Sequence, residues 1–165
     1  MCIRDRPWVN RLFDFSTQWI VSKEKIVCLG ATSFENHPSG SYLATLAGKP
    51  FLQYEWALQN HMSVVEPLMR EIAEMGFFGN LGVDAFVYQQ GGVEKLQPIV
   101  EINGRKTMSW VALMIQQKQF PNQILRFSFE KGAGGLLPQK LFVGEKERFF
   151  THQIHLEIGQ KLYFS

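Results

Sequence analysis

Two consecutive β-strands joined by a glycine-containing turn constrain the fold of this chain most strongly. Residues 79–90 and 96–103 are rich in β-branched, aromatic and other apolar side chains. The stretch between them, Gln90-Gly91-Gly92-Val93-Glu94, is typical of a hairpin loop. The pattern therefore predicts an antiparallel pair of strands in the middle of the chain.

The register of this hairpin decides which side chains share a face. If the hairpin is symmetric about Gly92 and Val93, Asp84 lies directly opposite Glu101. Side chains alternate along a strand, so Asn103 lies on the same face as Glu101. The other face is expected to belong to the core and carries apolar residues throughout: Val83, Ala85, Val87, Pro98, Val100 and Ile102.

Two carboxylates across from each other are destabilising unless a cation or a proton neutralises them. Mg²⁺ prefers oxygen ligands and takes one or two carboxylates together with waters and substrate phosphates. We therefore predict a metal site at Asp84, Glu101 and Asn103. Arg105 and Lys106 follow directly and could neutralise phosphate oxygens. The alternative is a solvated acidic face, which is common on hairpins.

Further strands are expected on both sides of the hairpin. Residues 12–21 alternate with period two, and residues 26–29 form a second apolar strand that we expect to end at Gly30. The composition of residues 35–41 predicts a loop. Residues 124–129 and 140–143 also have the character of strands.

The helices are expected before and after the hairpin. Residues 51–60 and 63–75 predict two separate helices, and Ser63 with Glu66 would form a capping box at the start of the second. Gly76 is expected to end that helix. A further helix begins at Thr107 or Ser109 and runs to about Gln119. The predicted fold class is α+β, an antiparallel sheet with helices packed on one face.

Composition excludes several classes of protein. The 165 residues, 45% of them hydrophobic, are enough for one domain with its own core. A net charge of +2 gives no basic stripe for nucleic acid, and no apolar run is long enough to cross a membrane. Cys2 and Cys28 are the only cysteines, which favours a reducing, cytoplasmic location. The sequence does not indicate an oligomeric state.

The hairpin residues resemble a known family. The segment 79–88, with its glycine-rich entry and Asp84, followed by Pro98-Ile99-Val100-Glu101-Ile102-Asn103-Gly104-Arg105, resembles the end of an ATP-grasp domain. In that family the pattern is a strand with Asp followed by a strand ending Glu-x-Asn-x-Arg. The resemblance implies that Asp84, Glu101 and Asn103 bind Mg²⁺ (or Mn²⁺), and that Arg105 contacts a phosphate or acyl phosphate. Gly104 stands where many members have proline.

The resemblance extends back to Pro7 and forward to Leu113. It implies that Trp8 lies against the adenine of ATP, that Asp14 binds the ribose hydroxyls, and that Phe86 forms part of the adenine floor. On packing grounds alone, Trp8 and Phe86 are also typical core residues. The expected architecture is the C-terminal half of an ATP-grasp domain over residues 7–120, with an extension over residues 121–165.

One departure from the family pattern concerns the start of the chain. Residues 1–6 resemble a translated sequencing adapter and are expected to be a non-native leader. Arg6 stands where the family has a hinge glutamate, and the two lysines that contact ATP would lie further upstream. We therefore expect the chain to be a fragment that is inactive alone.

The resemblance implies an ATP- and magnesium-dependent ligase. ATP would phosphorylate a small carboxylate substrate, and an amine or another nucleophile would then displace the phosphate. Two alternatives stay open. One is a non-catalytic nucleotide-binding or structural module with the same fold, and the other is a different ATP-grasp chemistry, such as a kinase or carboxylase subunit. The sequence does not identify the substrate.

Overall fold

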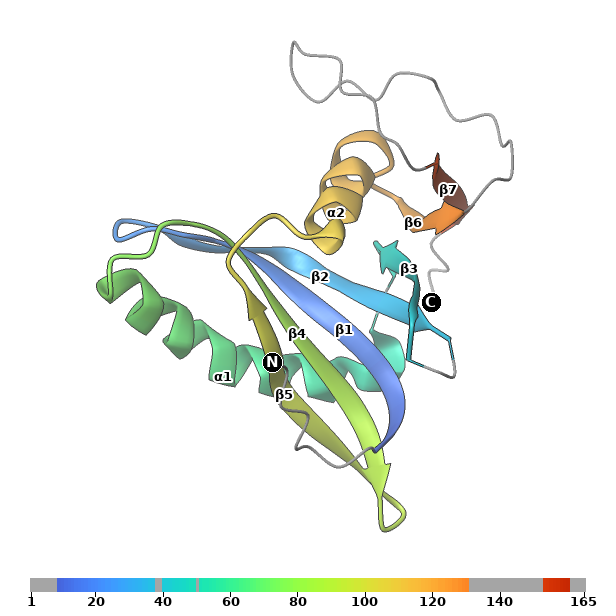
Figure 1. Cartoon of the computed structure of the whole chain (residues 1–165), viewed down its shortest axis with the longest axis horizontal. Coiled ribbons are helices and arrows are strands. Elements are labelled where there is room, and N and C mark those ends of the chain that lie inside the picture. Colours follow the sequence, from blue (N-terminus) through green and yellow to red (C-terminus); the bar gives the residue numbers. More distant parts are fainter. Residues whose placement is uncertain (1–8, 38–39, 50, 131–152, 161–165) are drawn as a thin grey trace. The chain divides into compact units, whose positions relative to one another are not determined.

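The computed structural model describes residues 9–37, 40–49, 51–130 and 153–160 (Figure 1). These residues separate into two compact units. The first comprises the described residues within 1–30 and 50–107, and the second those within 31–49 and 108–165. The predicted hairpin lies entirely within the first unit. The division at residue 120 that we expected from the sequence stays a prediction.

The first unit is built on three long strands and the beginning of a fourth. Strands β1 (Asn10–Val21), β4 (Gly79–Gln90) and β5 (Val93–Asn103) pair antiparallel in the order β5-β4-β1, and β2 (Ile26–Asn36) lies beside β1. The alternation predicted for residues 12–21 is confirmed. Phe15, Trp19 and Val21 are buried on the face that packs against a helix.

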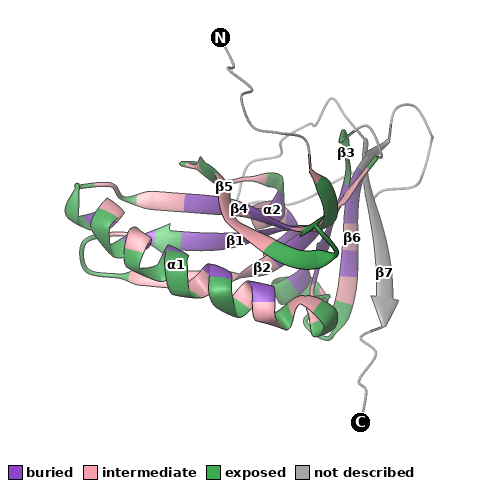
Figure 2. Ribbon diagram, turned by 90° about the horizontal axis from the view of Figure 1, so that it is seen from below, coloured by how far each residue is buried: buried purple, intermediate pink, exposed green. Residues whose placement is uncertain are grey.

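That helix, α1 (Glu55–Glu74), is a single element and follows a short 3-10 turn, η1 (Leu52–Tyr54). Its buried residues recur every four positions and form one stripe that packs against the strands: Ala57, His61, Val65, Met69 and Ala73. Figure 2 shows buried segments alternating with exposed ones along this helix. This continuous stripe explains why the chain forms one helix where the sequence predicted two. Ser63 lies inside the helix and donates a hydrogen bond to the Asn60 carbonyl, at 2.8 Å, so the predicted capping box was wrong.

The end of α1 follows the prediction. Gly76 has a positive φ of +92°, which disfavours residues with a side chain. Its N–H donates to the Ala73 carbonyl, and the N–H of Phe77 donates to the Ile72 carbonyl. These two bonds form a Schellman motif, which satisfies the last carbonyls of the helix and turns the chain toward β4.

The hairpin between β4 and β5 turns one position earlier than expected. Gln90 pairs with Val93, so the turn consists of Gly91 and Gly92, which both have positive φ. The register then shifts between Phe86, which pairs with Gln97, and Asp84, which pairs with Glu101. Because β5 advances four residues there while β4 advances two, β5 contains a bulge of two extra residues.

The predicted core face of this hairpin is confirmed on β4 and only in part on β5, where Pro98 and Val100 are half-buried. Val83, Ala85 and Val87 on β4 are buried. Ile102, however, is 41% exposed, so the prediction was wrong for this residue. β5 stands at the end of the strand order, where side chains have a neighbouring strand on one side only.

The second unit pairs its strands in the order β2-β3-β6-β7, with helix α2 (Met108–Gln119) packed on β3 and β6. β2 continues past Gly30 to Asn36, so the predicted end at Gly30 was wrong. β3 (Tyr42–Ala47) was not expected, whereas β6 (Gln123–Glu130) confirms the strand predicted over residues 124–129. β7 spans Gln153–Gln160, and the strand predicted over residues 140–143 lies outside the described residues.

The chain is thus an antiparallel α+β structure, and in each unit a helix covers one face of the strands. In the second unit the core is a small apolar cluster shared by α2, β3 and β6: Ala47, Ala112, Ile115, Leu125 and Phe127. No helix among the described residues is both long enough and apolar enough to cross a membrane.

Candidate functional site

The first unit carries a polar face opposite the one that packs on α1. Because Phe15 and Trp19 of β1 point toward α1, the alternating residues Asp14, Ser16 and Gln18 lie on the other side. Across β1 and β4, Asp14 pairs with Phe86, Ser16 with Asp84, and Gln18 with Gly82. Two predicted nucleotide-binding residues and one predicted metal ligand therefore share this face.

Asp84 is the electrostatic centre of the polar face. Burial raises the pKa of its carboxyl above the ordinary value, and the neighbouring carboxylates of Glu101 and Asp14 raise it further. A hydrogen bond from Ser16 and the positive charge of Arg105 act in the opposite direction. The folded chain thus holds two further acids, Glu101 and Asp14, near one partly buried carboxyl, an arrangement that a divalent cation would stabilise.

The predicted metal ligands converge. Glu101 lies directly across from Asp84, and the Asn103 amide nitrogen donates to the Asp84 Oδ2 at 3.3 Å. Arg105 is hydrogen-bonded to Asn103 in two ways. Its guanidinium donates to Asn103 Oδ1 at 3.5 Å, and its backbone N–H donates to the Asn103 backbone carbonyl at 2.8 Å. Glu101 and Arg105 are exposed, so both are accessible to a ligand from solvent.

The donor set is of the kind that a hard cation prefers. Among the described residues, no group of three or more His, Cys, Asp or Glu side chains is arranged to hold a metal. The predicted site offers two carboxylates, of Asp84 and Glu101, and the amide of Asn103. This number suits Mg²⁺, which keeps several waters or phosphate oxygens, better than it suits a cation enclosed by protein ligands.

The predicted nucleotide residues are only partly brought together. The Asp14 carboxylate accepts a hydrogen bond from Arg11 at 3.0 Å, and the Arg11 guanidinium lies over the Phe86 ring, 4.3 Å from its centroid. Phe86 is 9% exposed, and its ring contacts Tyr88 edge to face. Trp8 lies outside the described residues.

Sequence reasoning missed a hydrogen-bonded chain that ends at Asp84. The Thr107 hydroxyl donates to Gln18 Oε1 at 2.8 Å, and Gln18 Nε2 donates to the Ser16 hydroxyl oxygen at 2.8 Å. Ser16 in turn donates to the Asp84 carboxylate. Ser16 and Gln18 are fully buried. Their alternation with Asp14 along a predicted strand was the signal that could have identified them.

Gly82 allows this chain of hydrogen bonds to form. A Cβ atom at this position would lie 2.9 Å from the Thr107 Cγ2 and 3.2 Å from the Gln18 Oε1. Any side chain would push Thr107 and Gln18 apart. Gly82 is therefore required by close packing against Thr107 and Gln18, next to Asp84.

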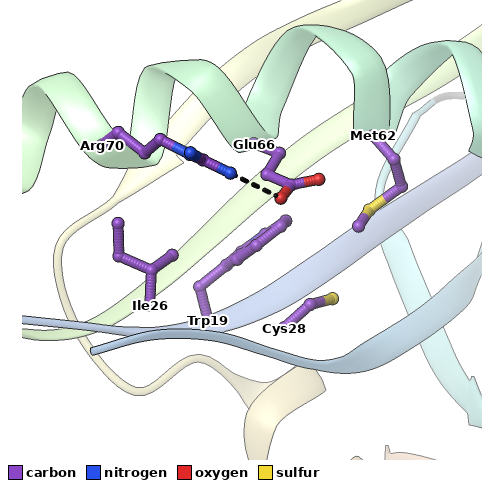
Figure 3. A pocket seen from close by; sticks show the side chains of 6 residues that line it. All are labelled: Trp19, Ile26, Cys28, Met62, Glu66 and Arg70. Atoms are coloured by element: carbon purple, nitrogen blue, oxygen red, sulfur yellow. Dashed lines mark hydrogen bonds and ion pairs between the residues drawn. The ribbon is translucent and has the colours of Figure 1, made fainter.

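A pocket on the α1 side of the same unit has different chemistry (Figure 3). It has a volume of about 340 Å³ and is lined by residues of α1, β1 and β2: Trp19, Ile26, Cys28, Met62, Glu66 and Arg70. Glu66 and Arg70 form an ion pair at 3.1 Å, and burial raises the pKa of the Cys28 thiol, which favours the unreactive protonated form. None of the predicted site residues lines this pocket.

Comparison with known proteins gives similarity at the level of the fold. No family model and no curated protein matches the sequence. The structure is similar to the biotin carboxylase domain of 2-oxoglutarate carboxylase from Hydrogenobacter thermophilus, which was crystallised with MgADP, ADP and bicarbonate. That match has a TM-score of 0.55 and 13% identity, and covers 90% of this chain and 41% of the other.

It is also similar to a pyruvate carboxylase of Rhizobium etli, with a TM-score of 0.52 and 11% identity. The match covers 74% of this chain and 14% of that one. The chain thus spans less than half the length of either protein. These two similarities confirm the expected ATP-grasp-like fold.

Proposed function

We propose that the intact protein is an ATP- and magnesium-dependent ligase that activates a small carboxylate as its acyl phosphate. The observation that carries this proposal is the direct pairing of Asp84 with Glu101, with Asn103 bonded to Asp84. Support also comes from the ATP-grasp-like fold and from a structural neighbour that binds MgADP and bicarbonate.

Each residue of the site would have its own task. Asp84 and Glu101 would hold Mg²⁺, and Asn103 would turn its amide oxygen toward the ion in exchange for its present hydrogen bond to Asp84. The metal would supply charge neutralisation for the ATP phosphates. Arg105 is exposed beside this cluster and would contact the transferred phosphoryl group.

Catalysis would depend on the positioning of ATP and the carboxylate and on neutralisation of the phosphate charge, more than on a covalent bond to the protein. The γ-phosphoryl group of ATP would pass to the substrate carboxylate, releasing ADP. An amine would then attack the acyl carbon and release phosphate. The hydrogen-bonded chain from Thr107 through Gln18 and Ser16 would keep Asp84 fixed during these steps.

The proposal is tested by Glu101→Gln in the intact protein. We expect ADP release and ligation to fall below one per cent of the wild-type rate, on the order of the loss for a removed transition-state contact, while the circular dichroism spectrum stays unchanged. Glu94→Gln is the matched control, since it makes the same change near the turn of the same strand. Retained turnover in Glu101→Gln would overturn the assignment.

A second candidate is a structural module that has this fold and no chemistry. One observation favours this candidate. Arg11 covers the Phe86 ring and forms an ion pair with Asp14, and it thereby occupies the place where adenosine would be expected. Magnesium-dependent binding of a fluorescent ATP analogue to the intact protein separates the two. Binding that requires the metal supports the ligase, and its absence supports the structural module.

A further inference from the structure

His61 connects α1 to the bulge of β5. It lies fully buried in the middle of the helix stripe, and its Nδ1 lies 2.7 Å from the carbonyl oxygen of Pro98. Its Nε2 lies 2.8 Å from the Thr17 hydroxyl on β1, which also accepts a hydrogen bond from the Trp19 indole N–H at 2.8 Å. One imidazole thus joins three elements of the first unit.

With a neutral imidazole, one placement of protons satisfies this network. The Pro98 carbonyl can only accept, so His61 carries its proton on Nδ1. The indole of Trp19 can only donate, so the Thr17 oxygen accepts from it and its own proton goes to His61 Nε2. Burial lowers the pKa of His61, which favours this neutral form over an imidazolium.

The residue that His61 binds lies inside the bulge. Pro98 falls between Gln97, which pairs with Phe86, and Glu101, which pairs with Asp84. Proline has no backbone N–H to offer the strand ladder, and here its carbonyl is used by His61. A second bond within the bulge runs from the Gln97 side-chain amide to the Ile99 carbonyl at 2.8 Å.

The bulge decides whether the two acids meet. Suppose that the pairing next to the turn, in which Phe86 lies opposite Gln97, continued along β5 without the bulge. Ile99 would then lie opposite Asp84, and Glu101 would lie opposite Gly82. The shift is two residues, so the side chains on either side of the bulge would stay on their own faces. Ile99, which packs against the core cluster on the α1 side, would move to the face of Asp84. A hairpin without the bulge would thus preserve most of the apolar pattern, but it would lose the pairing of the acids and the core packing of Ile99.

We propose that His61 is a positioning residue, which holds the β5 bulge through Pro98 and thereby places Glu101 opposite Asp84. Its role in metal binding rests on the proposed function, whereas its role in register does not. His61 lies on the opposite side of the sheet from the acids and acts on them through the backbone of β5.

The experiment compares His61→Leu and His61→Asn with wild type in the 165-residue chain. Leu removes both hydrogen bonds, whereas Asn retains a donor for the Pro98 carbonyl. Cross-strand NMR contacts report the register directly. We expect His61→Leu to lose the contacts between residues 84 and 101 while it retains those between residues 87 and 96, and His61→Asn to retain both sets.

Mn²⁺ affinity is the second readout. We expect it to fall about tenfold in His61→Leu, the lower end for loss of a supporting contact, and to be largely restored in His61→Asn. Val65→Ala is the matched control, since it removes buried atoms one turn further along the same helix stripe. It should lower the unfolding temperature without changing either readout.

The outcomes separate the two proposals. Wild-type contacts between residues 84 and 101 in His61→Leu would overturn the positioning role, whatever the metal does. Unchanged Mn²⁺ affinity in Glu101→Gln would overturn the proposed metal site but leave the register test valid. If His61→Leu does not fold, the ¹⁵N spectrum of wild-type His61 decides, because an Nδ1 without a proton at neutral pH could not donate to the Pro98 carbonyl and would contradict the positioning role.

Discussion

Asp84 and Glu101 face each other across β4 and β5 although the turn end of the same hairpin is offset from that register by two residues. The pairing therefore depends on the bulge around Pro98 as well as on the turn. It brings two carboxylates together on a face where burial already raises the pKa of Asp84. The proximity of these two carboxylates destabilises the fold when no metal is bound, and the same proximity would make the site suitable for a cation.

Asp84→Asn is expected to stabilise the chain in the absence of metal. The raised pKa of Asp84 means that its ionised form is less favourable in the folded than in the unfolded state, so at neutral pH the charge opposes folding. Removing it should increase the free energy of unfolding by on the order of 0.5–2 kcal/mol. Urea denaturation in a chelating buffer measures this, and a lower stability than wild type would contradict the electrostatic reading.

Gly82→Ala is expected to destabilise the chain by about 1–3 kcal/mol through overpacking against Thr107 and Gln18. Gly104→Ala is the matched control, because its Cβ would make only an ordinary contact with Phe77, at 3.6 Å. Urea denaturation of both variants at the same pH compares them. Equal stabilities would show that the Thr107–Gln18 contact is not as tight as described.

Stability should decrease in mild acid because of His61. Burial lowers its pKa from the ordinary value of 6.5, so below about that pH the unfolded state binds a proton that the folded state does not. The free energy of unfolding should therefore fall as pH decreases from 6.5 toward the lowered pKa, by up to about 1.4 kcal/mol per pH unit.

The comparison with His61→Asn isolates this effect, since Asn retains a donor for Pro98 but does not titrate. Denaturation curves at pH 7.5 and at pH 5.5 should show a smaller loss of stability in the variant than in wild type. Parallel losses in the two proteins would assign the pH dependence to other groups.

The hairpin shows how far sequence reasoning could reach. Alternation identified both strands, and the pairing of Asp84 with Glu101 followed from an assumed turn one position from the real one. The bulge compensated for that difference, and nothing in the local pattern except Pro98 indicated it. A buried histidine on a distant helix supplies the missing constraint, which a strand pattern cannot contain.

Other differences have the same origin in tertiary packing. Ser63 is a residue type that favours the first position of a helix. The apolar stripe of α1 continues on both sides of it, and the packing of this stripe overrides that local preference. β3 was missed because Tyr42–Ala47 is short and follows a loop-like segment. Ser16 and Gln18 are polar residues on an inner strand, and only the structure reveals the partners that make their burial favourable.

Paramagnetic broadening by Mn²⁺ tests the central claim most directly. Substoichiometric Mn²⁺ added to the ¹⁵N-labelled chain should broaden the amide signals of Asp84, Glu101 and Asn103, and leave those of the turn at Gly91 and Gly92 sharp. Glu101→Gln should abolish this pattern, and Glu94→Gln should retain it. Broadening centred elsewhere, or unchanged in Glu101→Gln, would contradict a metal site between these two strands.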